Sequence, residues 1–345
     1  MWHRRYPLRA RATFTTYISP VTLDHLPSYD ELPATPGAPS GSSWGLWGAT
    51  DTLGCLNLLT PEKISAGVSC AMRGAVFNLN LEMELPGPPL FSRSAFEHVV
   101  HDFAVGHDDE LSGWNTQSSS QWDGFRHMRH PVYGHYNGVD DADHGIHHWA
   151  RRGIVGRAVL ADVARWRESV GRPIDPGAPS AIEIADLRAT LDAQGVQVDV
   201  GDILLVRTGW LAWYRGLGAA ERVELAATPH TPACGLQRGV ASARALWDLH
   251  IAAIAADNPA LEVMPFGFGK RDEASYWKED PGRAAETMLH FSLLGLLGIP
   301  IGEFFDLDAL AADCASDGRY TCLLTSAPLN VWAGVASPAN ALAIK

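Results

Sequence analysis

The chain lacks the sequence features of several protein classes. Its five cysteines include no C-x-x-C pair, which argues against a disulfide scaffold or a cysteine-based zinc site and is compatible with a reducing cytoplasm. No apolar run reaches the roughly 18 residues of a membrane span. The basic N-terminus has neither an apolar core nor a small-residue cleavage site, so we expect no secretory signal. We predict a cytoplasmic protein.

Charged residues are scarce, and the balance of charge is negative. They make up 19% of the chain, with a formal net charge of -12. This balance argues against nucleic acid or an anionic membrane as a partner, so we expect a small-molecule substrate. The sequence has no G-x-G-x-x-G, no phosphate loop and no G-x-S-x-G elbow. It therefore supports neither nucleotide binding nor a serine nucleophile of the common kind.

The organisation predicted along the chain is a single domain with an extension. Residues 1–43 are rich in Pro, Ser and Gly towards their end and are predicted to be an N-terminal arm or linker. Residues 44–345 are long enough for one catalytic domain with a substantial core.

Strands and helices are predicted to alternate, which favours an α/β fold. Thr60 and Pro61 have the residue types of a helix N-cap and first turn, and Gly195 is typical of a helix end. The predicted helices are 61–72, 183–194, 234–249, 284–297 and 306–314. The predicted strands are 75–85, 153–163, 202–207, 251–255, 299–301 and 320–325.

Histidines are concentrated in one part of the chain. Nine of the 14 lie between His98 and His148, and imidazole is both a proton carrier near neutral pH and the commonest metal ligand. Asp123 and His127 are four residues apart with Gly124 between them, so they could face one pocket and exchange a proton with a substrate. A capping aspartate beside an exposed histidine explains the same spacing.

A second pair of candidate residues lies far downstream. His290 is in an apolar run, and Glu303 follows in G-I-P-I-G-E. A carboxylate in such surroundings is costly unless it is paired or bound to a metal. His290 and Glu303 are therefore candidates for the second half of the same site.

Several segments together resemble the cyclase family, whose relatives include kynurenine formamidase and isatin hydrolase. The resemblance extends from about Trp44 to Lys345. The segments that carry it are W-G-A-T-D-T-L-G-C-L-N-L-L-T-P-E, S-Q-W-D-G-F-R-H, G-D-I-L-L-V-R-T-G-W, A-A-D-N-P-A-L-E and the terminal S-P-A-N-A-L-A-I-K. The resemblance implies a swivelling β/β/α fold and an oligomer of identical subunits, here a homodimer or homotetramer.

The family motif H-x-G-T-H-x-D-x-P-x-H holds a divalent metal through its first two histidines and its aspartate. Aligned on Asp123, this motif places Gln117 and Gln121 at the two histidine positions, Phe125 at the proline and His127 at the last histidine. By the same resemblance, His290 and Glu303 match the downstream site residues. The implied metal set is Gln117, Gln121, Asp123, His290 and Glu303, with His127, Asp123 and Glu303 in catalytic roles.

The two glutamines leave it undecided whether a metal is bound and through which ligands, because neutral amides cannot match two imidazoles in affinity for zinc or manganese. The ion could be weakly bound or absent, or other histidines could replace the missing ligands; the candidates are His98, His101, His130 and His135.

The first functional hypothesis is a metal-assisted hydrolase of a small amide or lactam. There are two alternatives. One is a metal-independent lyase or cyclase that uses His127, and the other is a relative that binds a ligand without turnover. Aromatic residues, Trp122 and Phe125 among them, are predicted to contact an apolar or aromatic substrate.

Overall fold

The fold is built on a mixed β-sheet, and the computed structural model describes residues 26–228, 231–266 and 277–345. Within these ranges, nine strands form one sheet in the order β1-β13-β11-β5-β7-β9-β10-β4-β12. The pairs from β5 to β10 are parallel and the flanking pairs are antiparallel. The strands of this sheet are β1 Val76–Asn78, β4 Gln121–Asp123, β5 Ile154–Asp162, β7 Ile203–Arg207, β9 Ala253–Ala256, β10 Ile301–Glu303, β11 Thr321–Ser326, β12 Ala336–Pro338 and β13 Ala341–Ile344.

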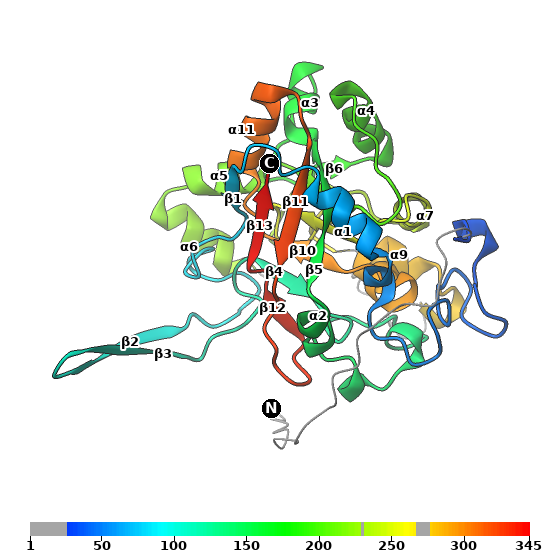
Figure 1. Cartoon of the computed structure of the whole chain (residues 1–345), viewed down its shortest axis with the longest axis horizontal. Coiled ribbons are helices and arrows are strands. Elements are labelled where there is room, and N and C mark those ends of the chain that lie inside the picture. The colour runs from blue at the N-terminus through cyan, green and yellow to red at the C-terminus, as the bar shows by residue number, and fades with distance from the viewer. Residues whose placement is uncertain (1–25, 229–230, 267–276) are drawn as a thin grey trace.

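Helices surround this sheet (Figure 1). They are α1 Pro61–Val68, α2 His147–Arg152, α3 Val163–Ser169, α4 Ile184–Gln194, α5 Trp210–Gly216, α6 Ala219–Ala227, α7 Val240–Asp248, α9 Arg283–Thr287, α10 Leu289–Ser292 and α11 Asp308–Asp317. A π-helical turn covers Leu293–Leu297, and 3₁₀ turns cover Tyr29–Glu31, Gly54–Leu58, Tyr136–Gly138 and Asp141–Asp143. The predicted α/β class is confirmed. None of the described helices has the length and hydropathy that crossing a bilayer requires.

Helix α1 begins where the sequence predicts. The Thr60 side chain accepts a hydrogen bond from the Lys63 backbone N–H at 3.4 Å, and Pro61 is the first helical residue. Near the end of α1, Gly67 lies directly against β5. A Cβ on Gly67 would come within 2.6 Å of backbone atoms of Gly156 and Arg157. The absence of a side chain therefore allows this close packing.

Gly67→Val is expected to destabilise the fold by about 1–3 kcal/mol, because α1 must move away from β5 to admit the side chain. The free energy of urea-induced unfolding measures this effect. Ser65→Ala, an exposed change in the same helix, serves as the control. An unchanged unfolding free energy for Gly67→Val would show that α1 adjusts without cost.

The helix predicted at 61–72 ends earlier, at Val68, and the strand predicted at 299–301 lies at Ile301–Glu303. Three further predicted elements need a larger correction. The strand predicted at 75–85 is only β1, since the Asn80 side chain donates to the Ala341 carbonyl at 2.9 Å and replaces the backbone ladder. The helix predicted at 234–249 starts at Val240, because Gly235–Leu236 forms β8 and pairs with β6, Ala181–Ile182. The helix predicted at 284–297 is interrupted at Met288, which has extended backbone angles.

The N-terminal extension is packed on the domain where it is described. The Tyr29 N–H donates to the Asp248 carboxylate at 2.7 Å, and the Trp247 indole N–H donates to the Pro27 carbonyl at 2.8 Å. Ser43 is buried and its hydroxyl donates to the Leu297 carbonyl at 2.9 Å. Residues 26–43 are therefore a packed extension and not a free linker; residues 1–25 of the predicted arm lie outside the described residues.

A two-stranded hairpin projects from the body of the molecule (Figure 1). It consists of β2, Glu97–Phe103, and β3, Gly106–Ser112, which form a sheet separate from the main one. The hairpin leaves the body just before the segment that leads into β4.

Candidate functional site

The two halves of the predicted site meet through the pairing of β4 with β10. Gln121 lies directly opposite Glu303 in this antiparallel pair, and Asp123 lies opposite Ile301. Because side chains alternate along a strand, Gln121, Asp123 and Glu303 project from the same face. All three are buried. The pairing therefore gathers polar side chains that are about 180 residues apart in the sequence.

His290 completes this buried cluster from α10. Its Nε2 is 3.1 Å from Glu303 Oε1 and 3.5 Å from Asp123 Oδ2. Its Nδ1 lies 2.9 Å and 3.0 Å from the two oxygens of Glu262. Glu262 also accepts the Leu289 N–H at 2.9 Å, and this bond accompanies the break between α9 and α10. Glu262 thus fixes the orientation of the imidazole.

Gln117 and Gln121 bind the carboxylates through their amide groups. Gln117 Nε2 donates to Asp123 Oδ1 at 2.7 Å and lies 2.9 Å from His127 Nδ1. Gln121 Nε2 donates to Glu303 Oε2 at 2.5 Å. Gln121 Oε1 is buried without a hydrogen-bond partner among the described residues, so one amide oxygen is still available to a ligand.

His127 lies at the edge of the cluster, on the turn after β4. The turn is closed by a bond from the His127 N–H to the Gly124 carbonyl. His127 Nε2 is 3.8 Å from Asp123 Oδ2, and 17% of the side chain is exposed, whereas Asp123 is fully buried. His127 can therefore contact both the buried carboxylate and a molecule outside the cluster.

Burial and proximity shift the protonation of these groups in different directions. Burial alone would raise the pKa of Asp123, but His127 and His290 outweigh it and hold the pKa at about 2. Burial, with a contribution from Asp123, raises the pKa of Glu303 to about 7. Burial lowers the pKa of His127. For His290, the effect of burial is outweighed by Glu262 and the other carboxylates, which raise its pKa well above the usual value.

The residues present fit a divalent cation. Ligand atoms of Asp123, His127 and His290 all lie within 4.8 Å of one another. Asp123 Oδ2 is buried and accepts no hydrogen bond within the described ranges, so it is free to bind an ion. The Glu262 carboxylate on the far side of His290 is the outer partner typical of a metal-binding imidazole. The mixed oxygen and nitrogen donors are compatible with manganese or zinc.

The aromatic residues predicted to contact the substrate are in the core. Trp122 alternates to the opposite face of β4 from Asp123, packs edge-on against Phe305 and donates to the Ser326 hydroxyl at 2.9 Å. Phe125 packs between Tyr136 and Trp149. Both side chains are nearly inaccessible to solvent, so the structure gives them a packing role.

The four alternative histidines do not join the Asp123–His127–His290 group. His98 and His101 are exposed on the hairpin, beside Asp109 and Glu110. The buried His130 accepts bonds from the backbone of its own loop, while His135 Nδ1 contacts the Phe125 carbonyl at 3.0 Å.

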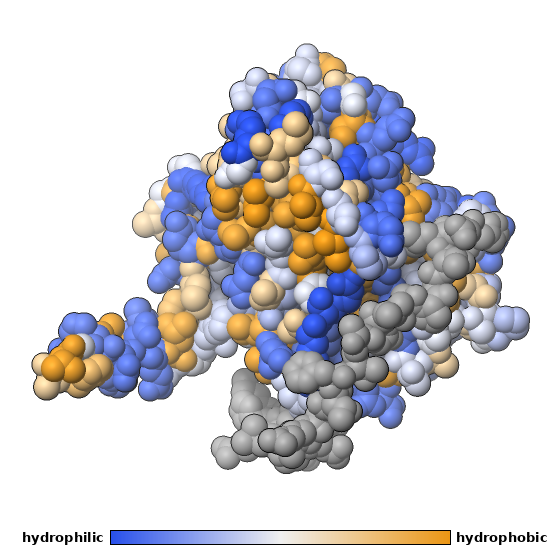
Figure 2. All heavy atoms as spheres, in the orientation of Figure 1, coloured by the Kyte–Doolittle hydropathy of each residue, from blue (hydrophilic) through white to orange (hydrophobic). Residues whose placement is uncertain are grey.

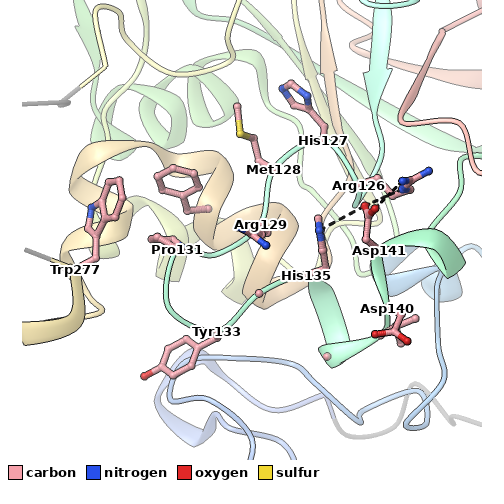
Figure 3. A pocket seen from close by; sticks show the side chains of 14 residues that line it. Arg126, His127, Met128, Arg129, Pro131, Tyr133, His135, Asp140, Asp141 and Trp277 are labelled. Atoms are coloured by element: carbon pink, nitrogen blue, oxygen red, sulfur yellow. Dashed lines mark hydrogen bonds and ion pairs between the residues drawn. The ribbon is translucent and has the colours of Figure 1, made fainter. Parts of the chain in front are cut away.

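A pocket of about 1120 Å³ borders the cluster at His127. Figure 3 shows His127 and Met128 on one wall, Trp277 across from them and His135 beside Asp141. The lining combines apolar side chains with charged ones of both signs; it includes Arg126, Met128, Arg129, Tyr133, His135, Asp140, Asp141, Trp277 and Phe291. Of the cluster residues described above, His127 is the one that lines this pocket.

Sequence reasoning missed two residues at the site. Glu262 is fully buried, and the argument applied to Glu303, a carboxylate within the apolar run N-P-A-L-E-V, would also have selected it. The Arg93 guanidinium donates to the backbone carbonyl of Gln117. Its charge also lowers the pKa values of Asp123 and Glu303. No local pattern in the sequence distinguishes Arg93.

The fold and the cluster define an α/β protein with a candidate metal-binding site. The family described as "Putative cyclase" matches residues 64–263, more than half of the chain, and the chain belongs to this family. A crystal structure described as a novel cyclase superposes with a TM-score of 0.73 at 29% identity, over 88% of this chain and 99% of that one. The predicted cyclase-like fold, with the residues before the family domain as an extension, is therefore confirmed.

More distant structures share the fold. Isatin hydrolase A from Ralstonia solanacearum has a TM-score of 0.51 at 15% identity, over 82% of this chain and 97% of that one. Isatin hydrolase A from Labrenzia aggregata, bound to benzyl benzoate, has a TM-score of 0.50, with the same identity and coverage. Comparison with curated proteins gives no significant match.

Proposed function

We propose that this chain is a metal-assisted hydrolase that cleaves the C–N bond of a small amide or lactam. One observation carries the proposal: His127, which lines the pocket, has a ligand atom within 4.8 Å of those of the buried Asp123 and His290, so a proton-transfer group lies beside two residues that could hold an ion. A carbonyl group that enters the pocket would reach the cluster on the His127 side. The isatin hydrolases named above, whose substrate is by name a small cyclic compound, add support by analogy only.

Asp123, His290 and Glu303 would hold the ion, with Gln121 Oε1 as a further oxygen. When bound, a divalent cation would polarise the substrate carbonyl and make a water molecule more acidic. Glu262 keeps Nε2 of His290 directed at this position, since it contacts Nδ1.

His127 would move the proton. Amide hydrolysis takes a proton from the attacking water and delivers one to the leaving nitrogen. Burial lowers the pKa of His127, so the ring is neutral at pH 7 and can accept the first proton. Gln117 contacts Nδ1 of the ring and holds Asp123 as well, so the base and the ion-binding carboxylate are positioned together.

Metal analysis of the purified protein, with turnover of a panel of amides and lactams before and after chelation, tests this proposal. We expect turnover that chelation abolishes and that added Mn²⁺ or Zn²⁺ restores. Turnover that is insensitive to chelation would contradict it.

A second candidate function is a metal-independent lyase or cyclase. The observation that favours it is that the amides of Gln117 and Gln121 already occupy one oxygen each of Asp123 and Glu303 by hydrogen bonding. His127 would then act as the acid–base group alone. Elimination or cyclisation by metal-free protein would support this candidate.

Gln121→His is expected to raise the affinity for the metal, because imidazole is a stronger ligand than an amide for these ions. The wild-type protein should be purified with less than one equivalent of metal. Titration of apo-protein by calorimetry measures both affinities, and Gln197→His, at a position remote from the cluster, is the control. Wild-type protein that keeps a full equivalent of zinc through dialysis against chelator would contradict the expectation.

A further inference from the structure

The projecting hairpin, residues 97–112, is called the arm from this point on; it is distinct from the N-terminal arm predicted at residues 1–43. Its two strands pair only with each other among the described residues, and nearly every position on them is exposed. An isolated two-stranded ribbon is at best marginally stable in water. The arm therefore lacks, within its own chain, the packing that would stabilise it.

Apolar side chains are exposed along the arm and at its tip. The exposed fractions are 55% for Val100, 52% for Phe103 and 92% for Val105. Figure 2 shows hydrophobic surface at the tip of the projecting part, with hydrophilic surface beside it. In the strand register Val100 lies opposite Asp109 and Phe103 lies opposite Gly106, so the two apolar side chains are on different faces of the ribbon. A partner that covers the arm must therefore wrap around it or receive its tip.

The charge of the arm limits the class of partner. The arm contains five carboxylates, and no Lys or Arg occurs between Arg93 and Arg126. Such a surface repels nucleic acid and anionic lipid. It fits a protein surface that combines apolar side chains with a cation.

This chain carries such a surface in the loop between β11 and β12, residues 331–335. Val331, Trp332 and Val335 are 51%, 44% and 38% exposed. The Arg151 guanidinium lies 5.9 Å from the Trp332 ring centre, and Arg151 has no carboxylate partner in the described part of the chain. In Figure 1 this loop and the base of the arm both lie at the lower end of the molecule.

We propose that the arm of one copy of this chain docks on the 331–335 loop of a second copy, and the reverse, around a two-fold axis. A standard interface uses roughly 20–30 residues on each side. Under two-fold symmetry each copy supplies both its arm and its loop surface, which together reach that size. Trp332 and Arg151 are of the residue types that contribute most to interface affinity.

The mass of the full-length protein in solution, measured by light scattering and sedimentation across a concentration series, tests this pairing. The wild type is expected to be a dimer, or a tetramer built from such dimers. Val100→Asp with Val105→Asp changes the arm, and Trp332→Ala changes the loop. Each variant is expected to raise the dissociation constant of the dimer at least about tenfold. Val170→Asp, at an exposed valine directly after α3, which Figure 1 shows at the opposite end of the molecule from the 331–335 loop, should leave the dimer intact.

All the substituted side chains are exposed, so circular dichroism should show that the variants are folded. Monomeric wild-type protein at micromolar concentration would overturn the proposal. So would a dimer that survives either the arm variant or the loop variant. Because the readout is mass and not turnover, its outcome is independent of the proposed hydrolase activity.

Discussion

His127→Ala is expected to lower kcat by about 10²–10⁴-fold, the usual contribution of a positioned acid–base group. His127 lies between the buried Asp123 and the pocket, where a proton can pass between the substrate and the cluster. Steady-state kinetics on whichever amide or lactam the panel identifies measures the effect.

A matched control exists on the same pocket. The His135 side chain is 14% exposed, close to the 17% of His127, and both line the pocket, but His135 lies outside the Asp123–His127–His290 group. His135→Ala should therefore affect KM more than kcat. If His127→Ala keeps more than about a tenth of the wild-type kcat, another group moves the proton.

The pH dependence of kcat gives an independent reading of the same role. A general base works in its deprotonated form, and burial lowers the pKa of His127 from its ordinary value of 6.5. The contribution of His127 to the rate should thus be lost as the pH drops through the lowered pKa, below 6.5. A limb that begins above pH 7 would assign the proton to a different group.

Glu262→Ala is expected to destabilise the metal-free protein by about 3–5 kcal/mol, because it leaves the buried Nδ1 of His290 and the Leu289 N–H without a partner. Glu303 and Asp123 face only Nε2 of the ring. His290 is 1% exposed and Glu262 is fully buried, so water cannot replace the lost carboxylate. Chemical unfolding measures this loss. Glu224→Ala, on the exposed surface of α6, should have almost no effect.

Glu262→Gln distinguishes the role of Glu262 in orienting His290 for metal binding from its role in stabilising the fold. It keeps the size of the side chain but removes the charge that orients His290, and such outer partners typically contribute 10–100-fold to metal affinity. Titration of the apo-variant with Mn²⁺ or Zn²⁺ measures the change. If this variant binds metal as tightly as the wild type, then Glu262 stabilises the fold without preparing the site.

The parts of the fold that local patterns determine could be predicted from the sequence. The cap at Thr60, the buried strands β5 and β7 and the end of α4 at Gly195 lie within one or two residues of their predicted positions. Each depends on neighbours in the sequence. The helix predicted at 284–297 failed because the carboxylate that takes the Leu289 N–H comes from Glu262, which is remote in the sequence.

At the candidate site, too, some features could be predicted from the sequence and others could not. The structure brings Asp123, His127, His290 and Glu303 together; the first two belong to the motif segment, and the other two were named from the wider family resemblance. No strand was predicted around Trp122, and only a strand imposes the alternation that directs this side chain into the core, so its orientation could not be inferred. The arm was also missed, because nothing in a polar, histidine-rich run shows whether it will leave the body of the molecule.

The pairing of β4 with β10 has a consequence for folding kinetics. Gln121 and Glu303 are joined across 182 residues, and β12, near the C-terminus, pairs with the other edge of β4. Contacts of such high sequence separation form slowly and late. During refolding, the capacity to bind metal should return only with the slowest phase, after most helical signal has recovered. Metal binding would then report the completed chain and not its intermediates.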